Sequence, residues 1–85
     1  MADKNVQLKR ELVGKKVQDA MRKKGLSVEE LRWRDIPKQD GSELIIRHAA
    51  KRKIFPFDDF ELVALREDEL DQQVDEIVDS LIFDL

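Results

Sequence analysis

Residues 68–85 carry apolar side chains at helical spacing, and this pattern constrains the fold more than any other feature of the chain. On a helix of 3.6 residues per turn these residues form one broad stripe, and acidic residues occupy the other face. The stripe consists of Leu70, Val74, Ile77, Val78, Leu81, Ile82 and Leu85. Such a stripe must be covered by another layer, so we expect an acidic helix packed on a sheet.

Residues 4–24 are predicted to form a second amphipathic helix, in this case with a basic outer face. Gly25 is typical of the residue that follows a helix, and basic residues in the last turn suit the helix dipole. Gly14 lies inside the segment and weakens the helix by about 1 kcal/mol relative to alanine. The apolar arc contains Val6, Val13, Val17, Ala20 and Met21.

A short helix is predicted to begin at Ser27, because the residues from Ser27 to Glu30 have the types found in a capping box. Pro37 disfavours helical backbone at the residue before it, so the helix should end by Arg34. The Asp40-Gly41 pair that follows is a strong turn signal.

Residues 43–51 admit two interpretations, a strand or a helix. Ile45 and Ile46 favour a strand over residues 43–48, placed in a hairpin after the Asp-Gly turn. Its partner could be residues 32–36 if the helix at Ser27 is only one turn long. Ser42 could instead cap a helix that runs through residue 51. We favour the strand.

The segment KRKIFPFDDF, residues 51–60, is expected to cross the core with its charges emerging on opposite sides. We expect Ile54, Phe55, Phe57 and Phe60 to be buried, and Pro56 restricts the segment to an edge strand or a loop. Residues 60–65 are a further strand candidate.

Together the patterns predict a small α+β fold, with residues 1–85 as a single domain. It would contain the basic N-terminal helix, a short second helix or turn, two or three antiparallel strands and the acidic amphipathic C-terminal helix. An all-α fold is the alternative.

The charges divide the chain into a basic half, residues 1–53, and an acidic half, residues 54–85. The first half has 15 Lys and Arg against 8 Asp and Glu, whereas the second has Arg66 against 11 acids. The net charges are therefore +7 and −10, which sum to the −3 of the whole chain. Halves of opposite sign indicate two different partners or self-complementation.

The residue types present argue against an enzyme. The chain has a single histidine, His48, no cysteine and no tyrosine, and its 3 glycines are isolated. This excludes His/Cys metal sites and glycine-rich phosphate loops. Asp58 and Asp59 could form a carboxylate pair, but such a pair is more often a turn or helix cap. We therefore predict no catalytic residue, no metal site and no cofactor.

The chain shows no sign of a membrane segment. No run approaches the roughly 20 apolar residues of a spanning helix, and the first residues lack the apolar region of a signal peptide. We expect a cytoplasmic protein that does not bind membranes.

Three clusters of basic residues could contact nucleic acid. Trp33 between two arginines could stack on a base, or it could be a core residue whose neighbours point outward in a strand. We favour the core interpretation for Trp33, and the whole-chain pI of about 5.2 counts against nucleic-acid binding. The candidate residues are Lys15, Lys16, Arg22, Lys23, Arg32, Trp33, Arg34, Arg47, Lys51, Arg52 and Lys53.

The stretch LVGKKVQDAMRKKGLSVEELRWR, residues 12–34, resembles the first two helices of phage-repressor-type helix-turn-helix domains. The resemblance lies in the basic-Gly-Leu turn followed by Ser27 and two glutamates, and it covers about a quarter of the chain. It implies that residues 42–52 form a recognition helix, with Arg47, Lys51 and Arg52 facing a DNA groove. The chain departs from that family at Arg32, Pro37 and Asp40-Gly41.

A split-charge surface suits recognition better than catalysis, because long-range potentials steer partners. We therefore predict a non-enzymatic protein-binding or regulatory module that uses the acidic C-terminal helix. Its candidate binding residues are Asp75, Glu76, Asp79 and Phe83. The alternatives are a small nucleic-acid-binding regulator that uses the basic half and a self-associating structural protein.

Overall fold

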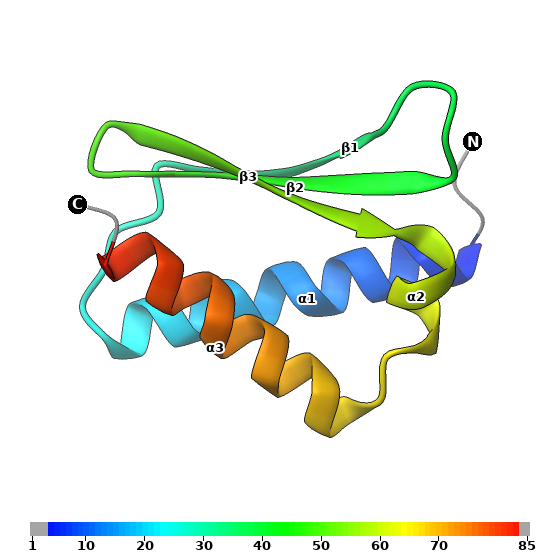
Figure 1. Ribbon diagram of the computed structural model, residues 1–85. Helices are drawn as coiled ribbons and strands as arrows, with labels where there is room; N and C mark the ends of the chain where they lie inside the picture. The colour runs from blue at the N-terminus through cyan, green and yellow to red at the C-terminus, as the bar shows by residue number, and fades with distance from the viewer. Residues whose placement is uncertain (1–3, 84–85) are drawn as a thin grey trace.

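A computed structural model of the chain describes residues 4–83 and has two layers, a sheet and a set of helices (Figure 1). The sheet is antiparallel, with the order β1-β2-β3. Helices α1 and α3 lie side by side beneath one face of the sheet, and α2 joins β3 to α3 at one end. The elements are α1 (Lys4–Lys23), β1 (Glu30–Asp35), β2 (Gly41–His48), β3 (Lys51–Asp58), α2 (Asp59–Ala64) and α3 (Glu67–Phe83). The α+β prediction is confirmed, with three strands.

The hydrophobic core lies between the helices and the sheet. The apolar stripes predicted for α1 and α3 are buried, with Val17 and Met21 of α1 fully inaccessible. Leu44 and Ile46 of β2 point down into the same core. Of the predicted α3 stripe, Leu70, Val74, Ile77, Val78 and Leu81 are buried, Ile82 is half-buried, and Leu85 lies outside the described residues.

Helix α1 ends as its sequence predicts, but its interior glycine has a packing role as well. Gly25 has a φ of 73°, and the N–H groups of Gly25 and Leu26 donate to the carbonyls of Arg22 and Met21. At Gly14, an added Cβ would lie 3.2 Å from Leu31 and 3.6 Å from the indole nitrogen of Trp33. Gly14 therefore lets α1 approach β1 closely.

The short helix predicted from Ser27 to Arg34 is wrong, because residues 30–35 form β1. The Asp-Gly turn leads from β1 into β2, and Trp33 lies opposite Leu44 in the antiparallel register. In β1, Leu31 and Trp33 point toward the helices and the arginines point to the other face. This alternation outweighs the local capping signal, since the strand packs two large, partly buried side chains against the core. Where the helix-turn-helix resemblance implies a second helix, the chain forms β1, and the residues of the implied recognition helix lie in β2 and at the start of β3.

The segment KRKIFPFDDF forms edge strand β3 and the start of α2. Phe55 and Phe57 pack against the core, but Ile54 is 44 % exposed and Phe60 is 85 % exposed, so the prediction that both are buried is wrong. Ile54 faces away from the helices because side chains alternate along a strand. Pro56 lies in an edge strand, as expected.

The strand candidate at residues 60–65 is also wrong, because residues 60–64 lie in α2 and Leu65 follows as its C-cap. The carboxylate of Asp58 accepts the N–H groups of Phe60 and Glu61, which is the geometry of a helix N-cap. The interpretation of the Asp58-Asp59 pair as a helix cap is therefore confirmed.

Candidate binding surfaces

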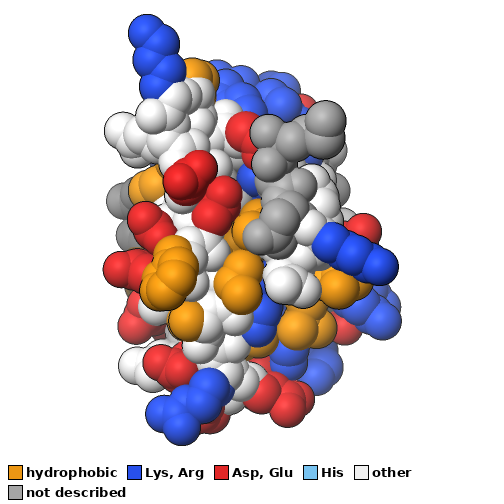
Figure 2. All heavy atoms as spheres, turned by 90° about the vertical axis from the view of Figure 1, so that its right-hand side faces the viewer, with side chains coloured by type: hydrophobic (Ala, Val, Ile, Leu, Met, Phe, Trp, Pro, Cys, Tyr) orange, Lys and Arg blue, Asp and Glu red, His pale blue; other side chains and the backbone are white. Residues whose placement is uncertain are grey.

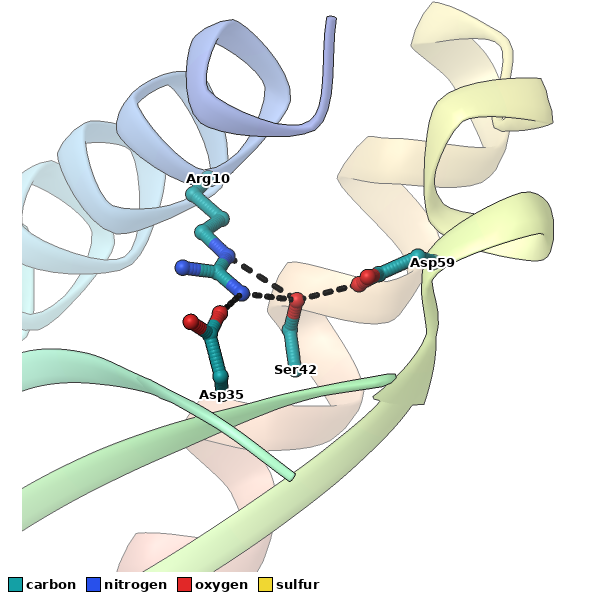
Figure 3. Close-up of polar contacts among 4 residues, drawn as sticks. All are labelled: Arg10, Asp35, Ser42 and Asp59. Atoms are coloured by element: carbon teal, nitrogen blue, oxygen red, sulfur yellow. Dashed lines mark hydrogen bonds and ion pairs between the residues drawn. The ribbon is translucent and has the colours of Figure 1, made fainter. Parts of the chain in front are cut away.

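A polar network centred on the buried side chains of Arg10 and Ser42 joins four elements at one end of the molecule (Figure 3). Arg10 of α1 is 6 % exposed, and its guanidinium donates to the Ser42 hydroxyl at 2.9 and 2.7 Å and to the Asp35 carboxylate. The Ser42 hydroxyl donates in turn to Asp59 at the start of α2. Ser42 is completely inaccessible, so no substrate can reach it, and the network holds α1, β1, β2 and α2 together.

Sequence reasoning missed this network, although one signal for it was present. Arg10 lies on the same helical arc as Val6, Val13 and Val17. A cation within an apolar stripe needs a buried partner, because an unpaired charge is costly to bury. The identity of that partner depends on the tertiary fold. The Arg10 guanidinium also lowers the pKa of the Asp35 carboxyl through its hydrogen bond and its charge.

The two oppositely charged halves of the chain meet where α1 packs on α3. Lys16 lies 2.8 Å from the Asp71 carboxylate and Lys24 lies 3.7 Å from that of Asp79. The Asp71 contact raises the pKa of Lys16. From the sheet, the Lys53 ammonium donates to the carbonyl and hydroxyl of Ser80. Part of the charge division therefore serves contacts inside the domain.

The sheet face that points away from the helices collects arginines from all three strands. In the register of the sheet, Arg32 lies opposite Ile45, which lies opposite Ile54 of β3. Ile45 is 1 % exposed, and the stems of such long neighbours can cover it. The gathered residues are Arg32, Arg34, Arg47 and Arg52.

Three of these arginines are neutralised by nearby glutamates. Arg34 contacts Glu43 at 3.2 Å, and Arg47 contacts Glu29 at 3.4 Å. Arg32 contacts Glu30 at 3.6 Å. Arg52 makes no ion pair within residues 4–83. The face is thus rich in guanidinium groups but has little excess positive charge.

Trp33 lies on the opposite side of the sheet from these arginines. Its ring packs 5.6 Å from that of Phe57, and the Arg10 guanidinium lies 5.9 Å from the ring centre. Trp33 is therefore a core residue, as favoured from the sequence, and it cannot stack on a base beside Arg32 and Arg34.

The remaining basic candidates do not join that face. Lys15, Lys16, Arg22 and Lys23 belong to α1, where Arg22 pairs with Asp19 of the same helix. Lys51 and Lys53 belong to β3 but alternate toward the helix side of the sheet. The fold therefore separates the candidates into an arginine face and an α1 group.

The acidic candidates on α3 also separate. Asp79 contacts Lys24, while Asp75 lies beside Lys16 and Lys23 in a shallow depression between α1 and α3. Glu76 lies on the side of α3 nearer β3, where it lines an open groove of about 370 Å³ with Phe55, Phe57 and Ile77. Phe83 is 82 % exposed, so its side chain does not pack on the core.

A second exposed phenylalanine was not foreseen. Phe60 of α2 is 85 % exposed and stands between acidic residues Asp59 and Glu61. Figure 2 shows the end of the molecule formed by α2 and the start of α1, where apolar side chains emerge with acidic side chains beside them. The other exposed apolar residues of these helices are Leu8, Leu12 and Val63.

No group of three His, Asp or Glu side chains within residues 4–83 could hold a metal ion. The Nδ1 atom of His48 lies 2.7 Å from the Ser27 carbonyl oxygen, and no carboxylate adjoins it among the contacts described. No helix within residues 4–83 is long and apolar enough to cross a membrane.

Comparison of the chain with protein-family models, curated proteins and solved structures found no match. Any functional conclusion must therefore come from the surfaces described above.

Proposed function

We propose that this domain is a non-enzymatic protein-binding module that acts in the cytoplasm and presents exposed phenylalanines among acidic side chains. The observation that carries the proposal is that Phe60 and Phe83 are 85 % and 82 % exposed, although the chain has only four phenylalanines. The other two, Phe55 and Phe57, pack against the core. Aromatic side chains are enriched at protein interfaces and dominate binding energy there.

The charges around the phenylalanines indicate the chemistry of the partner. Phe83 lies on the polar side of α3, four and seven residues after Asp79 and Glu76. Residues at these helical spacings share a face. Glu61 and Glu76 make no ion pair within residues 4–83, so their charges are available to a ligand. Phe60 belongs to α2 and Phe83 to the last turn of α3, and these two elements lie at opposite ends of the molecule (Figure 1). An apolar pocket with a basic rim on the partner would match either surface.

The proposal is tested by affinity capture with the purified domain, followed by identification of the bound proteins. Wild type, Phe83→Ala and Phe60→Ala are compared after nuclease treatment of the lysate. Lys15→Ala is the control, because Lys15 is exposed on the outer face of α1 and is not one of the exposed apolar residues of α1 and α2. We expect a protein that is retained by wild type and Lys15→Ala but lost with Phe83→Ala, and Phe60→Ala tests the separate surface on α2 in the same way. Equal retention by all four proteins would remove the phenylalanines from the interface.

Nucleic-acid binding is a second candidate, favoured by the four arginines that the strands place on one face. If they contact phosphates, affinity should fall steeply as salt rises, and Arg52→Ala should reduce the slope. An electrophoretic shift assay at low salt, with duplex and single-stranded probes, measures this. Absence of a shift at micromolar protein would dismiss this candidate and leave the first one standing.

A further inference from the structure

Within residues 4–83, strand β3 pairs with β2 along one edge, and its other edge has no partner strand. The Asp59 N–H donates to the Asp40 carbonyl at 2.9 Å, in register with the β2–β3 ladder. Hydrogen-bonded positions recur every second residue along an antiparallel strand. The backbone groups of Lys51, Lys53, Phe55 and Phe57 therefore face β2. Those of the alternate residues, Arg52, Ile54, Pro56 and Asp58, face away from the sheet.

The side chains of these outward-bonding residues are all exposed, and they lie on the face of the sheet away from the helices. Pro56 has no N–H, and proline on an edge strand commonly limits pairing with other chains. Arg52, Ile54 and Asp58 retain theirs. Free strand edges in proteins bind further strands through main-chain hydrogen bonds.

We propose that β3 pairs antiparallel with β3 of a second copy of this chain, about a twofold axis at Phe55. The reason is charge complementarity, because β3 is basic at residues 51–53, apolar in the middle and acidic at its last residue, Asp58, which Asp59 of α2 follows. An antiparallel copy reverses this order. Each basic end then lies beside the acidic end of the second copy, and the apolar middles coincide. Self-association of this kind brings a basic segment of one copy into contact with an acidic segment of the other.

One register pairs the unbonded backbone groups and the charges of β3 best. With Phe55 opposite itself, Arg52 faces Asp58 of the second copy and Ile54 faces Pro56, all at hydrogen-bonding positions. Arg52 lacks an ion pair within residues 4–83, and so does Asp58, whose carboxylate also caps α2. Only the bond that each Pro56 would have donated is missing.

The neighbouring registers are poorer. A shift that places Ile54 opposite itself moves Arg52 opposite Pro56, so the charge pair is lost. The opposite shift places Pro56 opposite itself and removes two donors at the centre of the interface.

Pairing in this register also covers apolar surface on both sides of the sheet. Ile54, which is 44 % exposed, would gain Pro56 of the second copy as its cross-strand neighbour. On the helix side, the two copies of Phe55 would meet across the axis beside the groove that Phe57 and Ile77 line. The assembly is closed, because a twofold contact uses up the edge in both copies.

Sedimentation equilibrium over a range of protein concentrations up to about 1 mM tests the proposal, a range that includes weak association. We expect a monomer–dimer equilibrium that Arg52→Glu weakens at least tenfold, because it places like charges opposite Asp58. Lys15→Glu, with the same charge change on the outer face of α1, and Phe83→Ala should leave the equilibrium unchanged. A monomer throughout, or equal weakening by Lys15→Glu, overturns the proposal. Neither result bears on partner binding through Phe83.

Cysteine pairing tests the register itself, since the chain has no native cysteine. Residues at a hydrogen-bonded antiparallel position have Cα atoms about 5.5 Å apart, which suits a disulfide. Mixing Ile54→Cys with Pro56→Cys protein should therefore give mixed disulfide dimers in excess of either homodimer. Preferential homodimers of Ile54→Cys would refute the proposed register and indicate the one with Ile54 at the axis.

Discussion

The turn between β2 and β3 should be strained, and changing Ala49-Ala50 to Asn-Gly should stabilise the protein. Ala49 and Ala50 have φ angles of 54° and 63°, so both lie in the left-handed region. A two-residue hairpin turn with two such residues is type I′, which strongly favours Asn-Gly. Alanine has a Cβ that contacts the following carbonyl in this conformation, at a cost of about 1–2 kcal/mol per residue.

The gain can be worked out for each position. At position 50, glycine removes the steric cost but adds about 0.5–1 kcal/mol of backbone entropy to the unfolded chain. At position 49, asparagine tolerates the left-handed region better than alanine does. The N–H of residue 50 still donates to the Glu29 carboxylate, so that contact is kept. The net stabilisation should be about 1–2 kcal/mol, which corresponds to a rise in Tm of roughly 4–15 °C in a domain of this size.

Urea denaturation is the appropriate assay, because an unchanged slope m shows that only stability has changed. Ala20→Gly within α1 is the matched control, and it should destabilise by about 1 kcal/mol or more, since glycine is unfavourable inside a helix. If Asn-Gly lowers the midpoint or leaves it unchanged, then the two alanines carry no strain and the turn argument is refuted.

Three further predictions concern the interior and its charges. Arg10→Ala should destabilise the domain by about 2–4 kcal/mol, because it empties a buried site and leaves the inaccessible Ser42 hydroxyl without its donor; thermal and urea unfolding measure this. Gly14→Ala should change the free energy of unfolding by less than about 1 kcal/mol, because alanine favours the helix while its Cβ crowds only the flexible end of the Leu31 side chain. The larger Gly14→Val should clearly destabilise the protein in the same assay. The Arg10 side chain lowers the pKa of Asp35, and the Arg66 backbone N–H lowers the pKa of Glu69. The free energy of unfolding should therefore fall as the pH drops below about 4 and both carboxylates take up protons. Tm measured from pH 6 to pH 2 should show this decline, and Arg10→Ala should make it shallower.

Both long helices could be predicted from the sequence because each buries one complete stripe. Their hydrophobic period is a local property, and the Asp-Gly turn and the β-branched residues of β2 are local signals too. Strand β1 could not be predicted in the same way. Ser27 and Glu30 signal a helix locally, whereas the strand depends on pairing with β2, whose partner residues lie up to 17 positions away in sequence.

The candidate sites show the same limit. The exposure of Phe83 was correctly expected, since it falls outside the apolar stripe of α3. Phe60 was expected in a strand within the core, but the cap at Asp58 turns residues 59–64 into a helix and directs Phe60 outward. The grouping of arginines on one sheet face depends on the register of three strands, which no single segment specifies.

The most direct test of the central claim is the affinity of the captured protein partner for wild type and for Phe83→Ala, measured by titration calorimetry with purified components. An aromatic anchor at a protein interface contributes about 2 kcal/mol or more, so we predict that Kd rises at least about 30-fold in Phe83→Ala. The melting temperature should remain that of wild type, because the Phe83 side chain is 82 % exposed. An unchanged Kd, or a weakening accompanied by a large fall in melting temperature, would contradict the claim that Phe83 serves a partner rather than the fold.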